Sequence, residues 1–136
     1  MKYVLDTNTV SALIKGVPEA TSRVRVLGRY DVAVPQPVLA EIEYGLARLS
    51  KSKRKARLVE RWLVLSAELP RAPWSDAVSE SFGAIKATLE RKGSRLEDFD
   101  IAIAAHAYAH DATLATGDMA HMKRIPGLAL EDWTKG

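Results

Sequence analysis

The chain has 136 residues, of which 47% are hydrophobic and 27% charged, and it contains no cysteine. This predicts one globular domain spanning residues 1–136, and it excludes disulfides, thiolate zinc sites and a cysteine nucleophile. The net charge of +3, from 20 Lys and Arg against 17 Asp and Glu, suits an anionic partner. Because Asp6 interrupts the N-terminal apolar stretch and the longest apolar run, near Ile101–Ala109, is too short for a membrane span, we expect a cytoplasmic protein with no membrane partner.

The first half of the chain alternates short apolar runs with helical patterns. We expect a strand at Lys2–Leu5, then a helix capped by Thr7 or Asn8, and a second helical stretch from Pro18 to about Gly28. Val32–Val34 is typical of a short buried strand. Helical spacing follows at Val38, Leu39, Ile42, Leu46 and Leu49.

The second half continues the alternation. A basic segment, Lys51–Arg57, leads into another helix, and the sequence between Pro70 and Pro73 is consistent with a short edge strand. The remaining expected elements are an amphipathic helix from Ala77 to Leu89, a buried apolar helix at Phe99–Ala109, a strand at Ala112–Thr116, a turn at Gly117–Asp118 and a strand at Leu128–Leu130. Strands that alternate with helices predict an α/β fold with a short, mostly parallel central sheet and helices on both faces.

Four acidic residues are candidates for one site, and the positions of three of them follow from where the strands end. Asp6 directly follows the first strand, Asp118 follows the strand at Ala112–Thr116 after one glycine, and Glu41 lies in the first turns of the helix entered from the second strand. Asp100 opens the buried helix. In open α/β sheets, ligands collect at the carboxyl ends of the strands. Four carboxylates gathered there would repel one another, so the pattern predicts a bound cation, and all-oxygen ligands select Mg²⁺ or Mn²⁺.

Each acid taken alone also has a purely structural interpretation. Asp6 can serve as a simple helix cap, and Asp118 can close an Asx-turn after Gly117. Asp98, beside Asp100, is the expected cap of the buried helix. The metal-site hypothesis rests on all four acids being in register with strand ends, a coincidence that independent caps and turns do not explain.

Several short motifs resemble those of one known family. The segment Val4–Asn8 resembles the opening motif of the PIN-domain nucleases, and Glu41–Gly45, Phe99–His106 and Leu114–Asp118 resemble its later blocks. The ending Pro126–Trp133 is similar to the tail of the VapC toxins of that family. The order and spacing of the motifs agree over essentially the whole chain.

The resemblance implies a PIN-like domain acting as a metal-dependent ribonuclease toxin, usually a homodimer, that a small VapB-type antitoxin neutralises. The family's acidic quartet falls on Asp6 and Asp100, interpreted as the principal Mg²⁺ ligands, and on Glu41 and Asp118, which complete the site. The polar residues that support the acids by hydrogen bonds in that family fall on Asn8 and Thr116. With such ligands, we expect metal-assisted hydrolysis that leaves 5′-phosphate and 3′-hydroxyl ends on RNA.

The basic residues have two interpretations. They form either a solvated helix face or a phosphate track for RNA, and the candidates are Lys51, Lys53, Arg54, Lys55 and Arg57. His106 lies within the apolar helix and is predicted to be a core histidine with its hydrogen bonds satisfied.

Three other functions compete with the nuclease. A phosphatase of the haloacid dehalogenase type needs a second acid at position 8, where this chain has Asn8. A signalling receiver domain needs a phosphoacceptor on a middle strand, but no Asp occurs between Asp31 and Asp76. A catalytically inactive PIN module that only binds a partner would not need all four acids.

Overall fold

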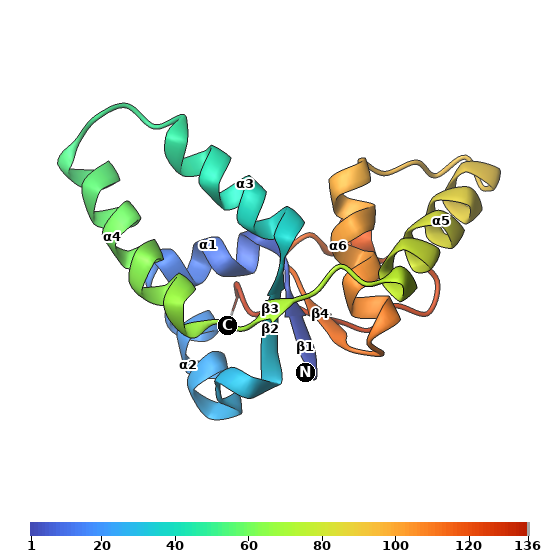
Figure 1. Ribbon diagram of the computed structural model, residues 1–136, viewed down its shortest axis with the longest axis horizontal. Helices are drawn as coiled ribbons and strands as arrows, with labels where there is room; N and C mark the ends of the chain where they lie inside the picture. The colour runs from blue at the N-terminus through green and yellow to red at the C-terminus, as the bar shows by residue number, and fades with distance from the viewer. Residues whose placement is uncertain (136) are drawn as a thin grey trace.

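The structure, a computed structural model that describes residues 1–135, has an α/β architecture (Figure 1). Gly136, the last residue of the expected domain, lies outside the described residues. Within residues 1–135, five short strands form one parallel sheet in the order β3-β2-β1-β4-β5. The strands are β1 (Tyr3–Leu5), β2 (Val32–Pro35), β3 (Arg71–Ala72), β4 (Thr113–Ala115) and β5 (Leu130–Glu131).

Helices connect the strands and cover both faces of the sheet. The α-helices are α1 (Thr7–Lys15), α2 (Pro18–Leu27), α3 (Gln36–Ala47), α4 (Lys53–Glu68), α5 (Asp76–Arg91), α6 (Asp98–Ala109) and α7 (Met119–Met122), with a 3₁₀ turn at Arg29–Asp31. In Figure 1, α1, α2 and α4 lie on one side of the strands, and α5 and α6 lie on the other. The predicted α/β fold is confirmed, and its sheet is wholly parallel.

The order of the strands determines where a ligand site can form. From the central β1 the chain adds β2 and then β3 on one side, and afterwards returns to add β4 and β5 on the other. The connections therefore diverge at the carboxyl ends of β1 and β4, and such a switch point leaves a crevice in an open parallel sheet. The two strand ends are tied together by the Asp6 N–H, which donates to the Ala115 carbonyl at 2.9 Å.

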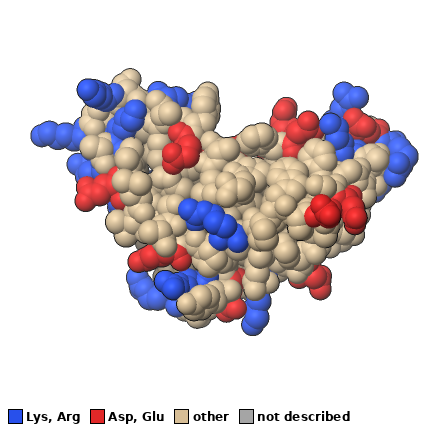
Figure 2. All heavy atoms as spheres, in the orientation of Figure 1, with Lys and Arg blue, Asp and Glu red and all other residues tan. Residues whose placement is uncertain are grey.

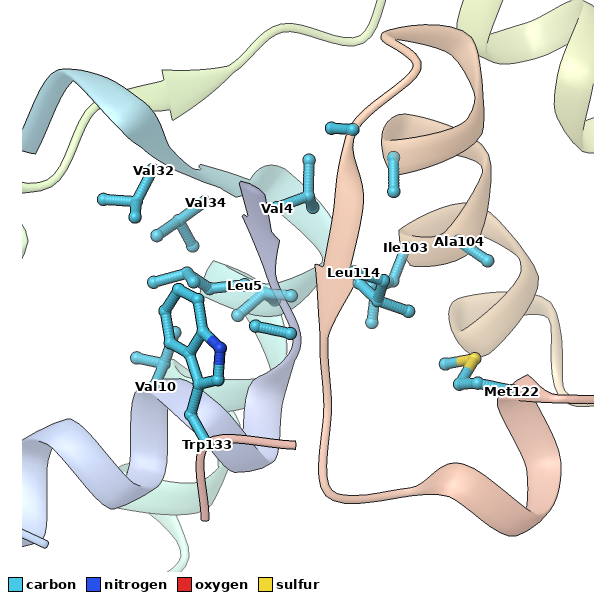
Figure 3. Packing of buried hydrophobic residues seen from close by; sticks show 14 of the residues in the cluster. Val4, Leu5, Val10, Val32, Val34, Ile103, Ala104, Leu114, Met122 and Trp133 are labelled. Carbon is cyan, nitrogen blue, oxygen red and sulfur yellow. The ribbon is translucent and has the colours of Figure 1, made fainter. Parts of the chain in front are cut away.

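The hydrophobic core is centred on β1 and extends over both faces of the sheet (Figure 3). Val4 and Leu5 of β1 are completely buried. Ile103 of α6 lies beside Leu114 on one side of the sheet, while Trp133 lies near the other end of the cluster. A strand with both faces covered must be apolar throughout, which is why these short strands show no polar alternation.

Some predicted boundaries and caps are wrong. Asp6, rather than Thr7 or Asn8, caps α1, and Glu97 occupies the cap position of α6, so that Asp98 is already helical. The turn expected at Gly117–Asp118 continues into α7, and the last strand lies at Leu130–Glu131 instead of Leu128–Leu130. None of the described helices has the length and apolar character needed to cross a bilayer.

His106 is buried as predicted, but its hydrogen bonding is only half satisfied. Its Nδ1 lies 2.7 Å from the Ala102 carbonyl, and its Nε2 has no partner. The Trp74 ring meets the imidazole edge-on, with centroids 5.2 Å apart. Burial lowers the pKa of His106, so the ring is held neutral.

Candidate active site

Asp6 is held at the end of β1 by four hydrogen-bond donors, two to its carboxylate and two to its carbonyl. Its carboxylate accepts a hydrogen bond from the Thr7 N–H at 2.7 Å, which caps α1, and another from the Thr116 hydroxyl at 2.7 Å. Its own carbonyl accepts from the N–H of Thr9 and of Val10, which begins the helix. Asp6 is only 4% exposed, and this burial raises the pKa of its carboxyl although the hydrogen bonds oppose the shift.

Thr116 joins two of the predicted acids. Its buried hydroxyl donates to Asp6 and accepts from the Asp118 N–H at 2.9 Å. Asn8 instead binds the backbone, since its Oδ1 accepts from the Gly117 N–H at 2.6 Å. Thr116 and Asn8, the two residues predicted to support the acids, therefore hold the loop after β4 against the start of α1. Thr116 binds the Asp6 side chain, and Asn8 binds the Gly117 main chain.

Glu41 approaches from the neighbouring connection. It lies on α3, and its Oε1 accepts a short hydrogen bond from the Thr7 hydroxyl at the start of α1. Glu43, two residues further on, accepts instead from the indole N–H of Trp62 on α4 at 2.7 Å. Only the first of these two glutamates lines the cavity with the other acids.

Asp100 enters from α6, on the other face of the sheet. It lies in the first turn of that helix, where the helix dipole favours a negative charge. Nevertheless, the pKa of Asp100 is raised to about 6, first by burial and then by the charges of Asp6, Glu41 and Asp118. Asp98 points away and pairs with Lys86 at 2.9 Å, so it is neither cap nor neighbour of the cluster.

Asp118 follows β4 and caps the short α7. Its carboxylate lies 2.8 and 2.9 Å from Nδ1 of His121, a residue one turn later on the same helix. This pair is not predictable from the sequence, because the spacing of three residues is informative only once a helix is known to begin at Asp118. His121 is half-exposed and opposes the upward pKa shift of Asp100.

All four predicted acids line one open cavity of about 700 Å³ at the switch point. Among residues 1–135, however, no three acidic or histidine side chains converge to the spacing of a ready-made metal centre. The donor set of carboxylate, amide and hydroxyl oxygens matches the ligands of a hard divalent cation. The cavity has further polar lining residues that no motif in the sequence indicates, which are Thr7, Ser11, Lys15 and Thr134.

The basic segment lies away from this cavity, at the outer end of the arm formed by α3 and α4, where Figure 2 shows Lys and Arg side chains gathered. Its members face different directions. Lys51 and Lys55 line a shallow hollow beside Val59 and Leu63 of α4, whereas Arg54 lines a groove toward α1 and α3. The segment is therefore not one continuous face.

The chain matches proteins of one family over almost its whole length. The PIN domain profile matches residues 3–128. Ribonuclease VapC2 of Rickettsia felis is 34% identical over 137 residues, which are 99% of this chain and 100% of that protein. The tRNA(fMet)-specific endonuclease VapC of Salmonella typhimurium is 29% identical and covers 98% of both chains.

Solved structures agree with the sequence matches. VapBC2 from Rickettsia felis, bound to a DNA fragment from their promoter, superposes with a TM-score of 0.85 at 32% identity over 98% of this chain and 99% of that chain. DNA-bound VapBC from Salmonella typhimurium gives a TM-score of 0.86 at 28% identity over 98% of each chain. The phosphatase and receiver alternatives are set aside by these matches, and the chain belongs to the PIN-domain family, among the VapC ribonucleases.

Proposed function

We propose that this chain is a Mg²⁺-dependent endoribonuclease that hydrolyses RNA phosphodiester bonds at the four-carboxylate cavity, with Mn²⁺ as an alternative metal. The observation that carries the proposal is that Asp6, Glu41, Asp100 and Asp118 all line one cavity at the sheet's switch point. The names of the relatives, a ribonuclease and a tRNA-specific endonuclease, support the same reaction class.

The proposed roles follow from how each acid is held. Asp6 and Asp100 are the principal metal ligands, and Glu41 and Asp118 complete the site; Thr116 keeps Asp6 and the backbone of Asp118 in position. PIN-domain nucleases are generally metal-dependent. A bound Mg²⁺ supplies Lewis-acid activation of a water molecule and neutralises charge that develops on the phosphodiester.

The raised pKa of Asp100 supports a cationic ligand. Burial is the first cause of the shift, and repulsion by the other three acids adds to it, because both disfavour the charged carboxylate. A divalent cation reverses that balance, since it stabilises the charged form of every carboxylate around it. Metal binding should therefore compete with protons below a pH of about 6, the raised pKa of Asp100.

The proposal includes the biological setting. We infer that the protein is the toxin of a toxin–antitoxin pair, that a VapB-type antitoxin inhibits it, and that it acts in the cytoplasm as a homodimer. The solved relatives named VapBC support the partner. The basic segment Lys51–Arg57 belongs to the RNA-contacting surface in this proposal, because its charge suits a phosphate backbone.

The test is cleavage of total RNA by the purified protein with Mg²⁺ or with EDTA, followed by mapping of the ends. Asp100→Asn should abolish cleavage because it removes a ligand, and Asp98→Asn on the same turn should not, because Asp98 pairs with Lys86 outside the cavity. Cleavage that persists in excess EDTA, or equal activity in both variants, would refute the metal mechanism.

Asp6 needs a more conservative change. Asp6→Ala removes the α1 cap and leaves the Thr116 hydroxyl without its acceptor, so it destabilises the fold as well as the metal site. Asp6→Asn removes the charge and keeps an oxygen to accept from the Thr7 N–H for the cap, while its amide NH₂ replaces the oxygen that accepts from Thr116 and can donate to that hydroxyl instead. We expect expression of the wild-type protein alone to arrest bacterial growth, and expression of the folded but inactive Asp6→Asn variant to leave growth unaffected.

A further inference from the structure

The segment Glu131–Thr134, here named the C-terminal clasp, forms part of the wall of the acidic cavity. It begins in β5, which pairs with β4, and the Thr116 N–H donates to the Glu131 carbonyl at 2.9 Å. The segment therefore leaves the sheet beside the loop that carries Asp118. Three residues later, Thr134 lines the cavity together with the four acids.

The clasp is anchored by a buried tryptophan and by an ion pair. Trp133 is 3% exposed, and its ring lies in the hydrophobic core (Figure 3). The carboxylate of Glu131 accepts from the Trp133 indole N–H at 3.0 Å and from the Arg23 guanidinium of α2 at 2.8 Å. That guanidinium lies 5.6 Å from the ring centroids of both Tyr3 and Trp133. The backbone that leads to Thr134 is therefore held against the core.

The side chain of Thr134 is held in one orientation. Its hydroxyl donates to Oδ1 of Asp132 at 2.6 Å, and its N–H donates to the same oxygen at 2.8 Å. The bond from the hydroxyl is the main reason why the pKa of Asp132 is lowered, so that Asp132 is a charged acceptor at neutral pH. Rotation of the Thr134 side chain would break this charge-assisted hydrogen bond.

Thr134 and Asn8 both close on Gly117, the residue before Asp118. The Gly117 N–H donates to Oδ1 of Asn8 at 2.6 Å. A Cβ at position 117 would lie only 2.9 Å from Oγ1 and 3.3 Å from Cγ2 of Thr134. The φ of Gly117 is not positive, so its backbone conformation would suit other residues. Glycine is therefore required here by the close approach of Thr134.

We propose that Thr134 is a positioning residue of the active site, which holds Gly117 and thereby fixes the carboxylate of Asp118 where the cavity binds its metal. Ligating groups must be held to within roughly 0.5 Å, and a loop achieves this only when neighbouring residues pack against it. Thr116 supports the Asp118 N–H by a hydrogen bond, and Thr134 adds a steric support to the preceding residue. This inference rests on the proposed metal-dependent nuclease function.

The experiment compares threonine variants by the binding of Mn²⁺ alone, followed through the electron paramagnetic resonance signal of the free ion. Thr134→Ala removes both atoms that approach Gly117, whereas Thr134→Ser keeps Oγ1 and its bond to Asp132. The matched control is Thr88→Ala, at a half-buried position of α5 outside the cavity. Because loss of a residue that orients a ligand typically costs 10–100-fold in metal affinity, Thr134→Ala should bind Mn²⁺ about tenfold more weakly. Thr134→Ser and Thr88→Ala should bind it like the wild type.

A second pair of variants tests the contact itself. Gly117→Ala places a methyl group against Thr134, so it should displace the loop and weaken Mn²⁺ binding by about tenfold as well. When Thr134→Ala is added, the space is free, and the double variant should bind Mn²⁺ more tightly than Gly117→Ala alone. Two substitutions that merely destabilise the protein would add their effects instead.

Amide hydrogen exchange in the metal-free protein gives a readout that needs neither metal nor activity. Thr134→Ala should speed exchange of the Gly117 and Asp118 N–H groups by about tenfold, because the loop opens more often. Exchange at Leu114 within β4 should not change. A purely structural role of Thr134 would instead lower the melting temperature while leaving the exchange pattern of the loop and the Mn²⁺ affinity as they are.

Wild-type Mn²⁺ affinity in Thr134→Ala, together with unaltered exchange at Gly117, would overturn the inference. So would an equal loss of affinity from Gly117→Ala with and without Thr134→Ala. A wild-type protein that binds no Mn²⁺ would overturn both the inference and the metal site on which it rests. A wild-type protein that binds Mn²⁺ but leaves total RNA intact would refute the nuclease alone, and the exchange and affinity measurements would still decide the role of Thr134.

Discussion

Asp100→Asn should stabilise the metal-free protein at neutral pH. The raised pKa means that the folded state holds a proton on Asp100 up to about pH 6, whereas the unfolded chain releases it near the ordinary value of 3.8. Where the folded state binds more protons than the unfolded state, the free energy of unfolding falls as pH rises. Wild-type stability is therefore lost between pH 3.8 and about 6, and Asn, which is always neutral, avoids that loss.

The magnitude follows from the size of the shift. A change from 3.8 to about 6 corresponds to roughly 3 kcal/mol at 1.36 kcal/mol per unit. Because the side chain is only partly buried, solvent screening reduces this to about 1–2 kcal/mol. For a domain of this size, the variant should melt roughly 4–8 °C higher than the wild type at pH 7.5.

The assay is thermal unfolding followed by circular dichroism in EDTA between pH 4 and 8. The difference between Asp100→Asn and wild type should be near zero at about pH 4 and should grow through pH 6. Asp98→Asn, on the same helix but in an exposed pair with Lys86, should follow the wild-type curve. A difference that does not vary with pH, or a less stable Asp100→Asn protein at pH 7.5, would refute the raised pKa of Asp100 that burial and the neighbouring acids produce.

Two further changes test the supports of the site and of the fold. Thr116→Val keeps the side-chain shape but removes the hydroxyl that binds Asp6 and the Asp118 N–H, so the free energy of unfolding measured in urea should fall by about 1–3 kcal/mol. A variant as stable as the wild type would show that the hydroxyl supports neither acid. Leu114→Ala opens a cavity at a completely buried position of β4 and should lower the free energy of unfolding by about 2–5 kcal/mol. The control Leu63→Ala, at a 66% exposed position, should change it by less than about 0.5 kcal/mol.

The positions of the acids were predictable because they depend on topology more than on side-chain detail. Short apolar strands separated by helices imply a parallel sheet, and the carboxyl ends of parallel strands share one edge. That rule alone brings Asp6 and Asp118 to the same place, since β1 and β4 are neighbours in the sheet. The buried helix that carries Asp100 was recognisable from its composition, as Ile101–Ala107 are all buried.

Features that depend on contacts between distant residues were not predictable from local patterns. The local pattern favours Thr7 or Asn8 as the cap of α1 and offers Asp6 either as a cap or as a metal ligand, whereas in the structure Asp6 both caps the helix and lines the cavity. The four residues of α7 are too few to show a helical period, so the pairing of His121 with Asp118 was missed. The groove that includes Lys15 exists only once α1, α3 and α4 pack together.

The four acids divide into two pairs with different mechanical support. Asp6 and Asp118 follow adjacent strands and share the Thr116 hydroxyl, so the sheet edge holds them. Glu41 and Asp100 are carried by α3 and α6, which contact each other above that edge. The separation of the carboxylates therefore depends on how closely these two helices approach. A cation bound by both pairs would link α3 and α6 to the sheet, whereas mutual repulsion of the charged carboxylates favours a wider cavity. The same arrangement brings the charges that, after burial, raise the pKa of Asp100.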